Sequence, residues 1–292
     1  MPLLITGAYG QVGRELVAQA GAQASGIDRD TLDLGKLDAV LDALRQLRPT
    51  IVINAAAYTA VDRAEQEVGE ALAANRDGVA NLATACGELR IPLLHLSTDY
   101  VFDGRKTTPY NEDDAPNPQG VYARSKWEGD QRLRELLDRH LILRVSWVFS
   151  AHGTNFVKTI VRLGAERPVL RIVADQHGGP TPAADIARAL LALARRHETD
   201  GSLPWGTYHY SGAPATSWHG FASAIVTRAA QLGMIPSAPE VAAITTAEYP
   251  LPAPRPANSV FDCSRAAKLL GLKQPDWRQG LDDVLHILKT AA

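Results

Sequence analysis

The sequence predicts an α/β protein in which a Rossmann-type, doubly wound parallel sheet is followed by a smaller C-terminal substrate-binding lobe. Three observations carry this prediction. Short apolar runs alternate with helical segments up to about residue 145, a glycine-rich turn follows the first run, and the pattern loosens into proline-rich sequence after residue 151. Short apolar strands that alternate with helices are typical of βαβ units, whose parallel sheet is buried on both faces.

Hydrophobic periodicity places the elements of the first half. Strands are predicted for the short apolar runs at 3–5, 24–27, 51–53, 93–96 and 141–145. Helices are predicted where apolar residues recur every three or four positions, at 11–20, 35–47, 63–89 and 121–139. Right-handed crossovers between such strands give the doubly wound fold, in which ligands bind beyond the carboxyl ends of the strands.

The second half is less regular. Helices are predicted at 154–164, 183–197, 217–232 and 279–290, among frequent prolines. We find no internal repeat. We therefore expect a cofactor-binding domain at 1–150 and a smaller substrate-binding lobe at 151–292, partly interleaved with the first unit.

Composition narrows the class of protein. The chain has 292 residues, a formal net charge of −2 and 46% hydrophobic residues, which is enough for an ordinary globular core. No basic stripe favours nucleic acid, no apolar run reaches the length of a membrane span, and no basic leader precedes the first strand. Cys86 and Cys263 are expected to be reduced thiols. We therefore expect a cytoplasmic protein that binds neither nucleic acid nor membranes.

The glycine turn between the first strand and the first helix is the first candidate site. Gly7, Gly10 and Gly13 have the spacing G-x-x-G-x-x-G. Glycines let the backbone approach a pyrophosphate, and the N-terminus of the following helix offers unpaired amide donors. The turn predicts a dinucleotide site, although a tight turn that only needs small residues gives the same pattern.

Residues after the second and third strands extend this site. Asp28 could accept hydrogen bonds from the adenosine ribose, which favours NADH, whereas Arg29 beside it could hold the 2′-phosphate of NADPH. The sequence leaves this choice open. The small residues within 54–59 would let a cofactor lie across the end of the third strand.

Tyr122 and Lys126 form the candidate catalytic pair. Of the eight tyrosines, Tyr122 alone has a lysine four residues later, and on a helix that spacing puts both side chains on one face. A nearby ammonium favours the phenolate and lowers the tyrosine pKa from its usual value of about 10. A hydroxyl within 97–100, at the end of the fourth strand, could bind the phenol or a substrate carbonyl. An exposed helix pair and a capped turn are the alternative interpretations.

The order of these motifs resembles that of the extended short-chain dehydrogenase/reductase family. The resemblance rests on stretches spread over nearly the whole chain, namely 5–13, 54–62, 97–104, 122–126, 144–148, 175–181 and 255–259. It implies reduction, by NADPH or NADH, of the C4 keto group of dTDP-4-dehydro-L-rhamnose to dTDP-L-rhamnose. The implied partner is a dTDP-linked 4-keto-6-deoxy sugar.

The resemblance also implies roles for single residues. Tyr122 would donate a proton to the C4 oxygen, Lys126 would lower the pKa of the tyrosine and hold the ribose, and Thr98 would orient the phenol and the carbonyl. With the residues above, the cofactor-binding set is Gly7, Gly10, Gln11, Val12, Gly13, Asp28, Arg29, Asp33, Leu34, Ala57, Tyr58, Thr59, Tyr122 and Lys126. The substrate-binding set is Thr98, Asp99, Trp147 and Arg255, the last as a partner of the diphosphate.

One departure and several alternatives remain. Some members of the family form a homodimer bridged by magnesium through glutamates. Glu15 matches the first of these, but alanine stands at the later position within 180–184, so we expect no metal site, and a homodimer without one stays possible. A sugar dehydratase is disfavoured because Tyr100 stands where a second carboxylate would follow Thr98 and Asp99. Another nucleotide-sugar 4-ketoreductase, such as one with a 6-deoxy-talose product, an epimerase, and a non-catalytic regulatory subunit stay open.

Overall fold

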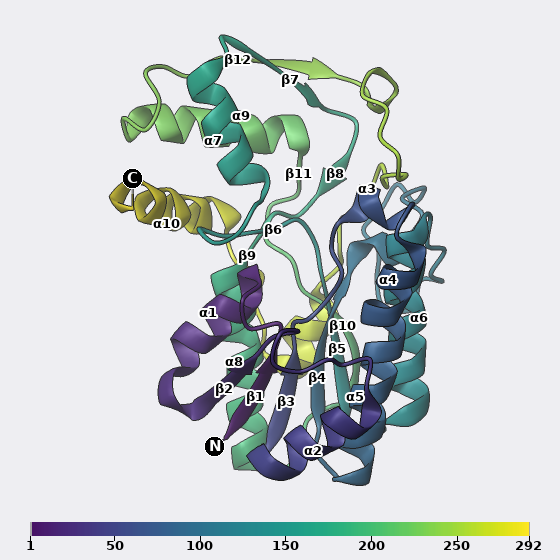
Figure 1. The fold of residues 1–292 in the computed structure, drawn as a ribbon. Helices are drawn as coiled ribbons and strands as arrows, with labels where there is room; N and C mark the ends of the chain where they lie inside the picture. The colour runs from purple at the N-terminus through teal and green to yellow at the C-terminus, as the bar shows by residue number, and fades with distance from the viewer. Residues whose placement is uncertain (1, 292) are drawn as a thin grey trace.

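A six-stranded parallel sheet forms the centre of the larger part of the molecule (Figure 1). The computed structural model describes residues 2–291, and the strand order is β10-β5-β4-β3-β1-β2. The strands are β1 (Leu3–Thr6), β2 (Ala24–Ile27), β3 (Ile51–Asn54), β4 (Leu93–Thr98), β5 (His140–Val145) and β10 (Gly206–His209). The order reverses between β1 and β3, so the predicted doubly wound fold is confirmed and its ligand crevice lies at the carboxyl ends of these strands.

Two layers of helices cover the sheet because successive strand residues point to opposite faces. Leu3 and Ile5 belong to one core cluster, whereas Leu4 between them belongs to the other. The face with Leu3 and Ile5 is covered by α1 (Gln11–Ala20) and α8 (Ala183–Asp200). The face with Leu4 is covered by α2 (Leu37–Leu47), α5 (Gly78–Glu88) and α6 (Val121–Leu136). Burial on both faces explains why the strands read as continuous apolar runs.

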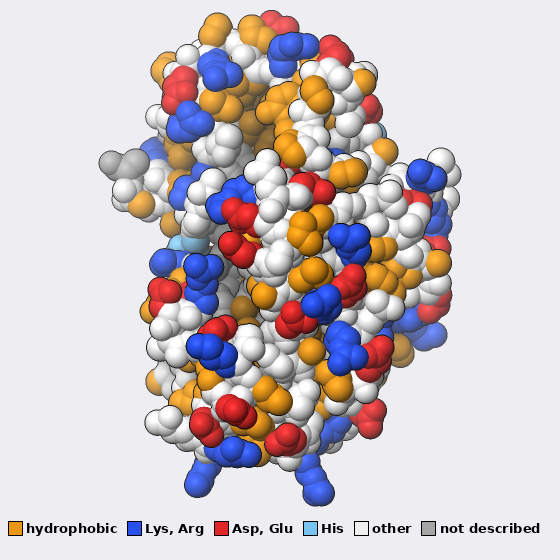
Figure 2. Space-filling view, turned by 45° about the vertical axis from the view of Figure 1, so that its right-hand side comes forward, with side chains coloured by type: hydrophobic (Ala, Val, Ile, Leu, Met, Phe, Trp, Pro, Cys, Tyr) orange, Lys and Arg blue, Asp and Glu red, His pale blue; other side chains and the backbone are white. Residues whose placement is uncertain are grey.

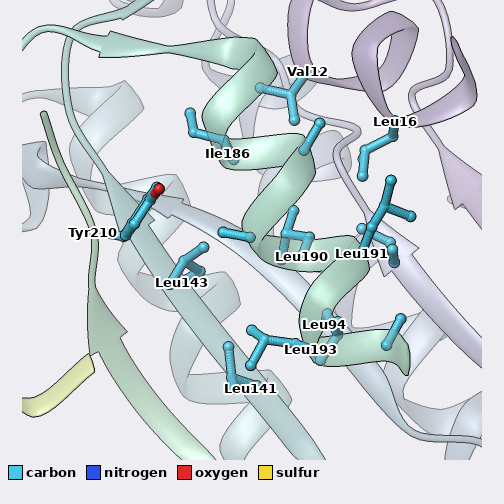
Figure 3. Packing of buried hydrophobic residues seen from close by; sticks show 14 of the residues in the cluster. Val12, Leu16, Leu94, Leu141, Leu143, Ile186, Leu190, Leu191, Leu193 and Tyr210 are labelled. Carbon is cyan, nitrogen blue, oxygen red and sulfur yellow. The ribbon is translucent and has the colours of Figure 1, made fainter. Parts of the chain in front are cut away.

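Helix α8 comes from the second half of the sequence but packs on the sheet (Figure 3). Its Ile186, Leu190 and Leu191 lie beside Val12 and Leu16 of α1. Its other buried residues reach the sheet, where β10 adds the outermost strand next to β5. The sheet-containing part of the molecule therefore draws two elements from beyond residue 150.

The alanine-rich segment predicted as one helix at 63–89 is broken, so that prediction is wrong. It consists of α3 (Val61–Ala64), α4 (Val68–Leu72), the π-helical turn η2 (Ala73–Asp77) and α5. The first break lies at Glu67, whose φ of −105° and ψ of 48° leave the helical region. In the π-helical turn, Asn75 is fully buried and bonds to the backbone of Tyr58. Hydrophobic periodicity does not register such a side-chain contact.

Other differences concern element ends. β4 continues to Thr98 instead of 96, which carries the strand into the candidate site. α6 ends at Leu136 instead of 139, because Leu137 turns to an extended ψ of 111° and β5 begins at His140. β10 was not predicted, since its four residues include glycine and histidine and have little apolar character.

The smaller lobe lies beyond the carboxyl ends of the sheet (Figure 1). Its core joins aromatic and aliphatic side chains such as Phe149, Ile160, Phe221 and Trp277. Its elements are β6 (Val148–Phe149), α7 (Phe156–Glu166), β7 (Val169–Val173), β8 (His177–Gly178), β9 (Thr181–Pro182), β11 (Thr216–Ser217), α9 (Trp218–Gln231), β12 (Glu240–Ile244) and α10 (Trp277–Thr290). The four helices predicted for this half are found as α7, α8, α9 and α10, each shifted by a few residues at its ends.

Candidate active site

The glycine turn has the geometry that a pyrophosphate requires. Gly7 has a φ of +72°, and a Cβ there would lie 2.6 Å from the backbone of Ala56. Gly10 is the N-cap of α1, and among residues 2–291 no side chain caps its first amides. These amides and the positive end of the helix dipole face the turn. The turn therefore fits the diphosphate of a dinucleotide, which Gln11, Val12 and Gly13 at the start of α1 would also meet.

A cavity of about 580 Å³ continues from this turn along the ends of β1 and β2. Seven of the predicted cofactor residues line it, namely Gly7, Asp28, Arg29, Asp33, Leu34, Ala57 and Tyr58. The carboxylates of Asp28 and Asp33 each accept a hydrogen bond from a nearby backbone amide, and Arg29 is exposed beside them. The cavity thus has the size and polarity for an adenosine, with an acidic and a basic group at its rim.

Sequence reasoning missed part of this cavity. Glu70, Ala73 and Ala74 line it from α4 and the π-helical turn, and Thr59 does not line it. Asn75 accepts from the Tyr58 amide at 2.8 Å and donates to the Tyr58 carbonyl at 3.0 Å, which fixes the loop after β3. Its third hydrogen bond, to the hydroxyl of Ser125 at 3.0 Å, ties this loop to α6. The sequence carries no signal for these contacts, because they depend on the broken helix.

Thr98, Tyr122 and Lys126 come together at the carboxyl end of β4. Thr98 ends the strand, and Tyr122 and Lys126 lie in the first two turns of α6. The Thr98 hydroxyl shares a hydrogen bond with the Tyr122 phenol, and the ring of Tyr100 meets that of Tyr122 edge-on at 5.6 Å. Lys126 Nζ donates to the Leu96 carbonyl at 2.8 Å. The structure thus brings the three predicted catalytic side chains into one place.

The protonation of Tyr122 differs from the sequence expectation. Burial raises the pKa of Tyr122 to about 12, which outweighs the lowering effect of its hydrogen bond with Thr98. Lys126 does not lower it, because its ammonium is turned to the Leu96 carbonyl and the His95 ring. Burial in turn lowers the pKa of Lys126 to about 8. At neutral pH the phenol is therefore fully protonated, as a proton donor must be.

Asp99 is a buried carboxylic acid beside this group. Its side chain accepts from the Thr98 hydroxyl at 3.1 Å, while its Oδ2 has no hydrogen-bond partner within residues 2–291. Burial raises the pKa of Asp99 to about 6, although hydrogen bonds with Ser259 and Thr98 oppose this shift. An unpaired buried oxygen is costly unless a ligand satisfies it. Asp99 therefore fits a substrate-binding role.

Trp147 is held by an unusual set of contacts. Its φ is +46°, which a bulky residue rarely adopts, and its indole stacks on that of Trp218 with centroids 3.6 Å apart. A Cβ at Gly178 would lie 2.5 Å from the Trp147 ring, so only glycine fits there. Trp218, the first residue of α9, was not singled out by sequence reasoning because its relation to Trp147 is a tertiary contact.

A second cavity, of about 750 Å³, lies between the lobe and the sheet end. Among its lining residues are Tyr100, Trp218, Gln176 and Arg255. Arg255 donates to Asp62 Oδ2 at 2.8 Å and lies 5.9 Å from the centre of the Tyr100 ring. Figure 2 shows hydrophobic side chains gathered in a hollow in the upper part of this face. The cavity combines apolar walls with a guanidinium, as a nucleoside diphosphate requires.

The remaining predicted features concern metals and membranes. Glu15 lies 3.5 Å from His152 Nε2 and accepts from Gln19. In the described part of the chain, residues 2–291, no three His, Cys, Asp or Glu side chains are grouped as metal ligands. Over the same range, no helix combines the length and the apolar character needed to cross a bilayer. Both cysteines are buried thiols without a disulfide.

Comparison with known proteins places this geometry in a family. The chain matches the family described as RmlD substrate binding domain over residues 1–290. A protein of Aggregatibacter actinomycetemcomitans named dTDP-4-dehydrorhamnose reductase is 43% identical over 286 residues, with 97% of each chain covered. The crystal structure of a Clostridium acetobutylicum protein of the same name has a TM-score of 0.91 at 34% identity, covering 99% of this chain and 100% of the other. A Bacillus anthracis protein of that name, solved in complex with NADP, has a TM-score of 0.89 at 35% identity, covering 98% and 100%.

Proposed function

The chain belongs to the RmlD substrate binding domain family, and we propose that it catalyses the NADPH- or NADH-dependent reduction of dTDP-4-dehydro-L-rhamnose to dTDP-L-rhamnose. The observation that carries this proposal is the hydrogen bond of Thr98 with Tyr122 at the end of β4, with Lys126 one turn further along α6 and bonded to the Leu96 carbonyl of the same strand. This is where a doubly wound sheet binds its ligands.

The nicotinamide cofactor, when bound, supplies the hydride that reduces the C4 carbonyl. The residues of this chain that would hold it are the amides after Gly10, Ala57, Tyr58 and Thr59 after β3, and Lys126. At the adenosine end, Asp28, Arg29, Asp33 and Leu34 line the cavity. Both an acidic and a basic residue are present there, so the structure supports use of either cofactor.

Tyr122 acts as the proton donor. Because the pKa of Tyr122 is raised to about 12, the phenol carries its proton at neutral pH and passes it to the C4 oxygen as that oxygen gains negative charge. The Thr98 hydroxyl, which shares a hydrogen bond with the phenol, orients both phenol and carbonyl. The same Thr98 hydroxyl favours the phenolate that remains, since its hydrogen bond lowers the pKa of Tyr122 against the effect of burial.

The sugar nucleotide occupies the cavity between the lobe and the sheet end. Arg255 faces this cavity and is paired with Asp62, from which a diphosphate can draw it by a bidentate contact. Trp218 forms part of the wall and Trp147 stacks behind it. Asp99, with one unpaired oxygen within residues 2–291, supplies an acceptor for a sugar hydroxyl.

Turnover measurements test this proposal. Oxidation of NADPH and of NADH is followed with and without dTDP-4-dehydro-L-rhamnose, and the product is identified by NMR. Tyr122→Phe should retain the cofactor and lose about 10²–10⁴-fold in kcat, the usual contribution of a positioned acid. Cofactor binding without turnover by the wild type would instead identify a regulatory subunit, and a product with the other C4 configuration would identify a talose-type reductase.

Three further expectations stay predictions. We expect the enzyme in the cytoplasm, in keeping with its buried, unbridged Cys86 and Cys263. We expect no metal that bridges two copies of the chain, and light scattering with and without EDTA would show whether the chain forms a homodimer. We also expect the cofactor and substrate units to divide near residue 150, with α8 and β10 assigned to the first by their packing.

A further inference from the structure

A buried chain of polar side chains runs behind the catalytic pair, from the glycine turn to Lys126. Asn54, at the end of β3, lies 3.0 Å from His95 Nδ1, and His95 Nε2 lies 3.3 Å from Lys126 Nζ. Asn54 and His95 are fully buried, and Lys126 is 2% exposed. A buried polar chain is costly unless its donors and acceptors match, so the contacts define where the protons lie.

The orientation of the Asn54 amide follows from its other partners. The Ala56 amide lies 3.0 Å from Asn54 Oδ1, and a backbone N–H can only donate. Thr6 donates its hydroxyl to the same oxygen at 2.7 Å. The oxygen of the amide must therefore face Ala56, and its nitrogen must face His95. Asn54 Nδ2 is a donor, so His95 Nδ1 has to be the acceptor.

This arrangement fixes the tautomer of His95. A neutral imidazole whose Nδ1 accepts carries its proton on Nε2. Burial, together with Lys126 and His140, holds the pKa of His95 well below its usual value, so the ring is neutral at neutral pH. The Nε2–H then points toward Lys126 Nζ, which is itself a donor to the Leu96 carbonyl. A neutral lysine nitrogen can accept a hydrogen bond from this N–H, whereas an ammonium has only donors and would repel it.

Asp130 offers the alternative acceptor. Its Oδ1 lies 3.9 Å from His95 Nε2 and has no hydrogen-bond partner within residues 2–291. Its Oδ2 accepts from the Ser97 hydroxyl at 2.9 Å and from Arg144 Nε at 3.4 Å. The charged or titratable groups that face the His95–Lys126 contact are therefore Asp130 of α6, with Arg144 and His140 of β5. The favourable charge of Asp130 acts on Lys126 against its burial.

We propose that His95 is a positioning residue for Lys126: fixed by Asn54 with its proton on Nε2, it holds the lysine at the Leu96 carbonyl and favours the neutral amine. When the lysine is charged, Asp130 Oδ1 is the acceptor for the hydrogen bond from His95 Nε2–H. The contact between His95 and Lys126 follows from the geometry alone, and only its importance for catalysis rests on the proposed function. The residues of β3 and β4 would thereby set how readily Lys126 exchanges a proton with its surroundings.

The tautomer can be observed directly in the wild-type protein. With ¹⁵N-labelled histidine, long-range ¹H–¹⁵N NMR separates protonated from unprotonated ring nitrogens for each of the eight histidines. The His95 signals are assigned from their absence in His95→Leu. We expect His95 to be neutral at pH 7 with its proton on Nε2. A proton on Nδ1, or a charged ring at pH 7, overturns the proposal, and the tautomer itself is read from the wild-type protein.

The effect on Lys126 is measured by titrating the Cε signals of the seven lysines in ¹³C-labelled protein, with Lys126 assigned from Lys126→Met. Two substitutions remove the His95 Nε2–H donor that faces the Lys126 ammonium, each in a different way. His95→Leu removes the donor that faces the ammonium. Asn54→Asp keeps an oxygen toward Ala56 but presents a second oxygen to His95 Nδ1, which moves the proton to Nδ1 and makes Nε2 an acceptor. Both substitutions should raise the titration midpoint of Lys126 by about one pH unit, which is a tenfold change in its proton affinity.

The double variant separates this effect from the charge that Asn54→Asp adds. In the His95→Leu background the tautomer no longer exists, so Asn54→Asp should move Lys126 by only a few tenths of a unit. An equal shift in both backgrounds, or no shift with either single variant, overturns the proposal. His140→Gln is the matched control: it removes another buried imidazole but leaves Asn54 and Lys126 in place, and should leave the tautomer unchanged. Absence of turnover with these NMR results intact would overturn the proposed function and leave the His95–Lys126 pair standing.

Discussion

The indoles of Trp147 and Trp218 lie in planes 5° from parallel with their centroids 3.6 Å apart. Trp147 follows β5 of the central sheet, and Trp218 begins α9 of the lobe. The stack therefore joins the two parts of the molecule beside the cavity proposed for the substrate, which Trp218 lines. Trp147 has a positive φ, a strained conformation that surrounding contacts such as this stack must hold in place.

Removal of this stack should weaken substrate binding. Trp218→Ala takes away an aromatic contact worth about 0.5–1.5 kcal/mol and frees the ring that packs on it, so KM for the sugar nucleotide should rise about tenfold. Trp218→Phe keeps an aromatic face and should recover most of the loss. The Kd for NADPH, measured by fluorescence titration, should not change in either variant. An unchanged KM in Trp218→Ala would show that the stack has no part in recognition.

Gly7→Ala should abolish cofactor binding. Its φ of +72° strains any other residue, and the new Cβ would lie 2.6 Å from backbone that cannot easily move. Gly21→Ala is the control, because it has a φ of +57° with nothing within 4 Å of the Cβ. Gly21→Ala should lose about 1 kcal/mol of unfolding free energy from the backbone strain, and Gly7→Ala should lose more because of the clash. Only Gly7→Ala should lose NADPH affinity. Equal affinities in the two variants would contradict the assignment of the turn to the diphosphate.

Asp99 should make the protein less stable as the pH rises from about 4 to 6. The folded-state pKa is raised to about 6, so the folded protein holds this proton where the unfolded chain has lost it. Stability from this group is therefore present below the unfolded pKa and is lost as the pH passes through that window. Asp99→Asn should remove a difference on the order of 1–3 kcal/mol between urea unfolding at pH 4 and at pH 6.5. Asp113→Asn, at an exposed carboxylate, serves as the control and should follow the wild type.

Arg29 should decide the preference for a 2′-phosphate. It lines the adenosine cavity next to Asp28 and is exposed, so it can turn to the phosphate without breaking a buried contact. Arg29→Ala should raise the Kd for NADPH about tenfold, the equivalent of one charge-assisted contact, and leave that for NADH unchanged. Asp28→Ala should instead raise the Kd for NADH. Loss of both affinities together in Arg29→Ala would mean that the residue supports the fold of the cavity.

Local pattern was sufficient for much of the fold and for the residue types of the site. The apolar runs around Leu4, Val52 and Leu94 form strands because burial on both faces requires an unbroken apolar run. The spacing of Tyr122 and Lys126 places them in successive turns of α6. Pattern failed at Asn75, where a side chain in a π-helical turn bonds to a distant backbone. It also failed at β10, whose four residues include glycine and histidine and form no apolar run.

The sequence by itself determined most strands and helices of the first half, the glycine turn and the candidate catalytic side chains, because each depends on residues close together in the chain. Only the tertiary structure decided that Lys126 faces His95 and Leu96 instead of the phenol, and that burial raises the pKa of Tyr122. Protonation depends on which groups from β3, β4, β5 and α6 surround a side chain and on how much water they exclude. That environment exists only when the strands are side by side, so no spacing along the chain encodes it.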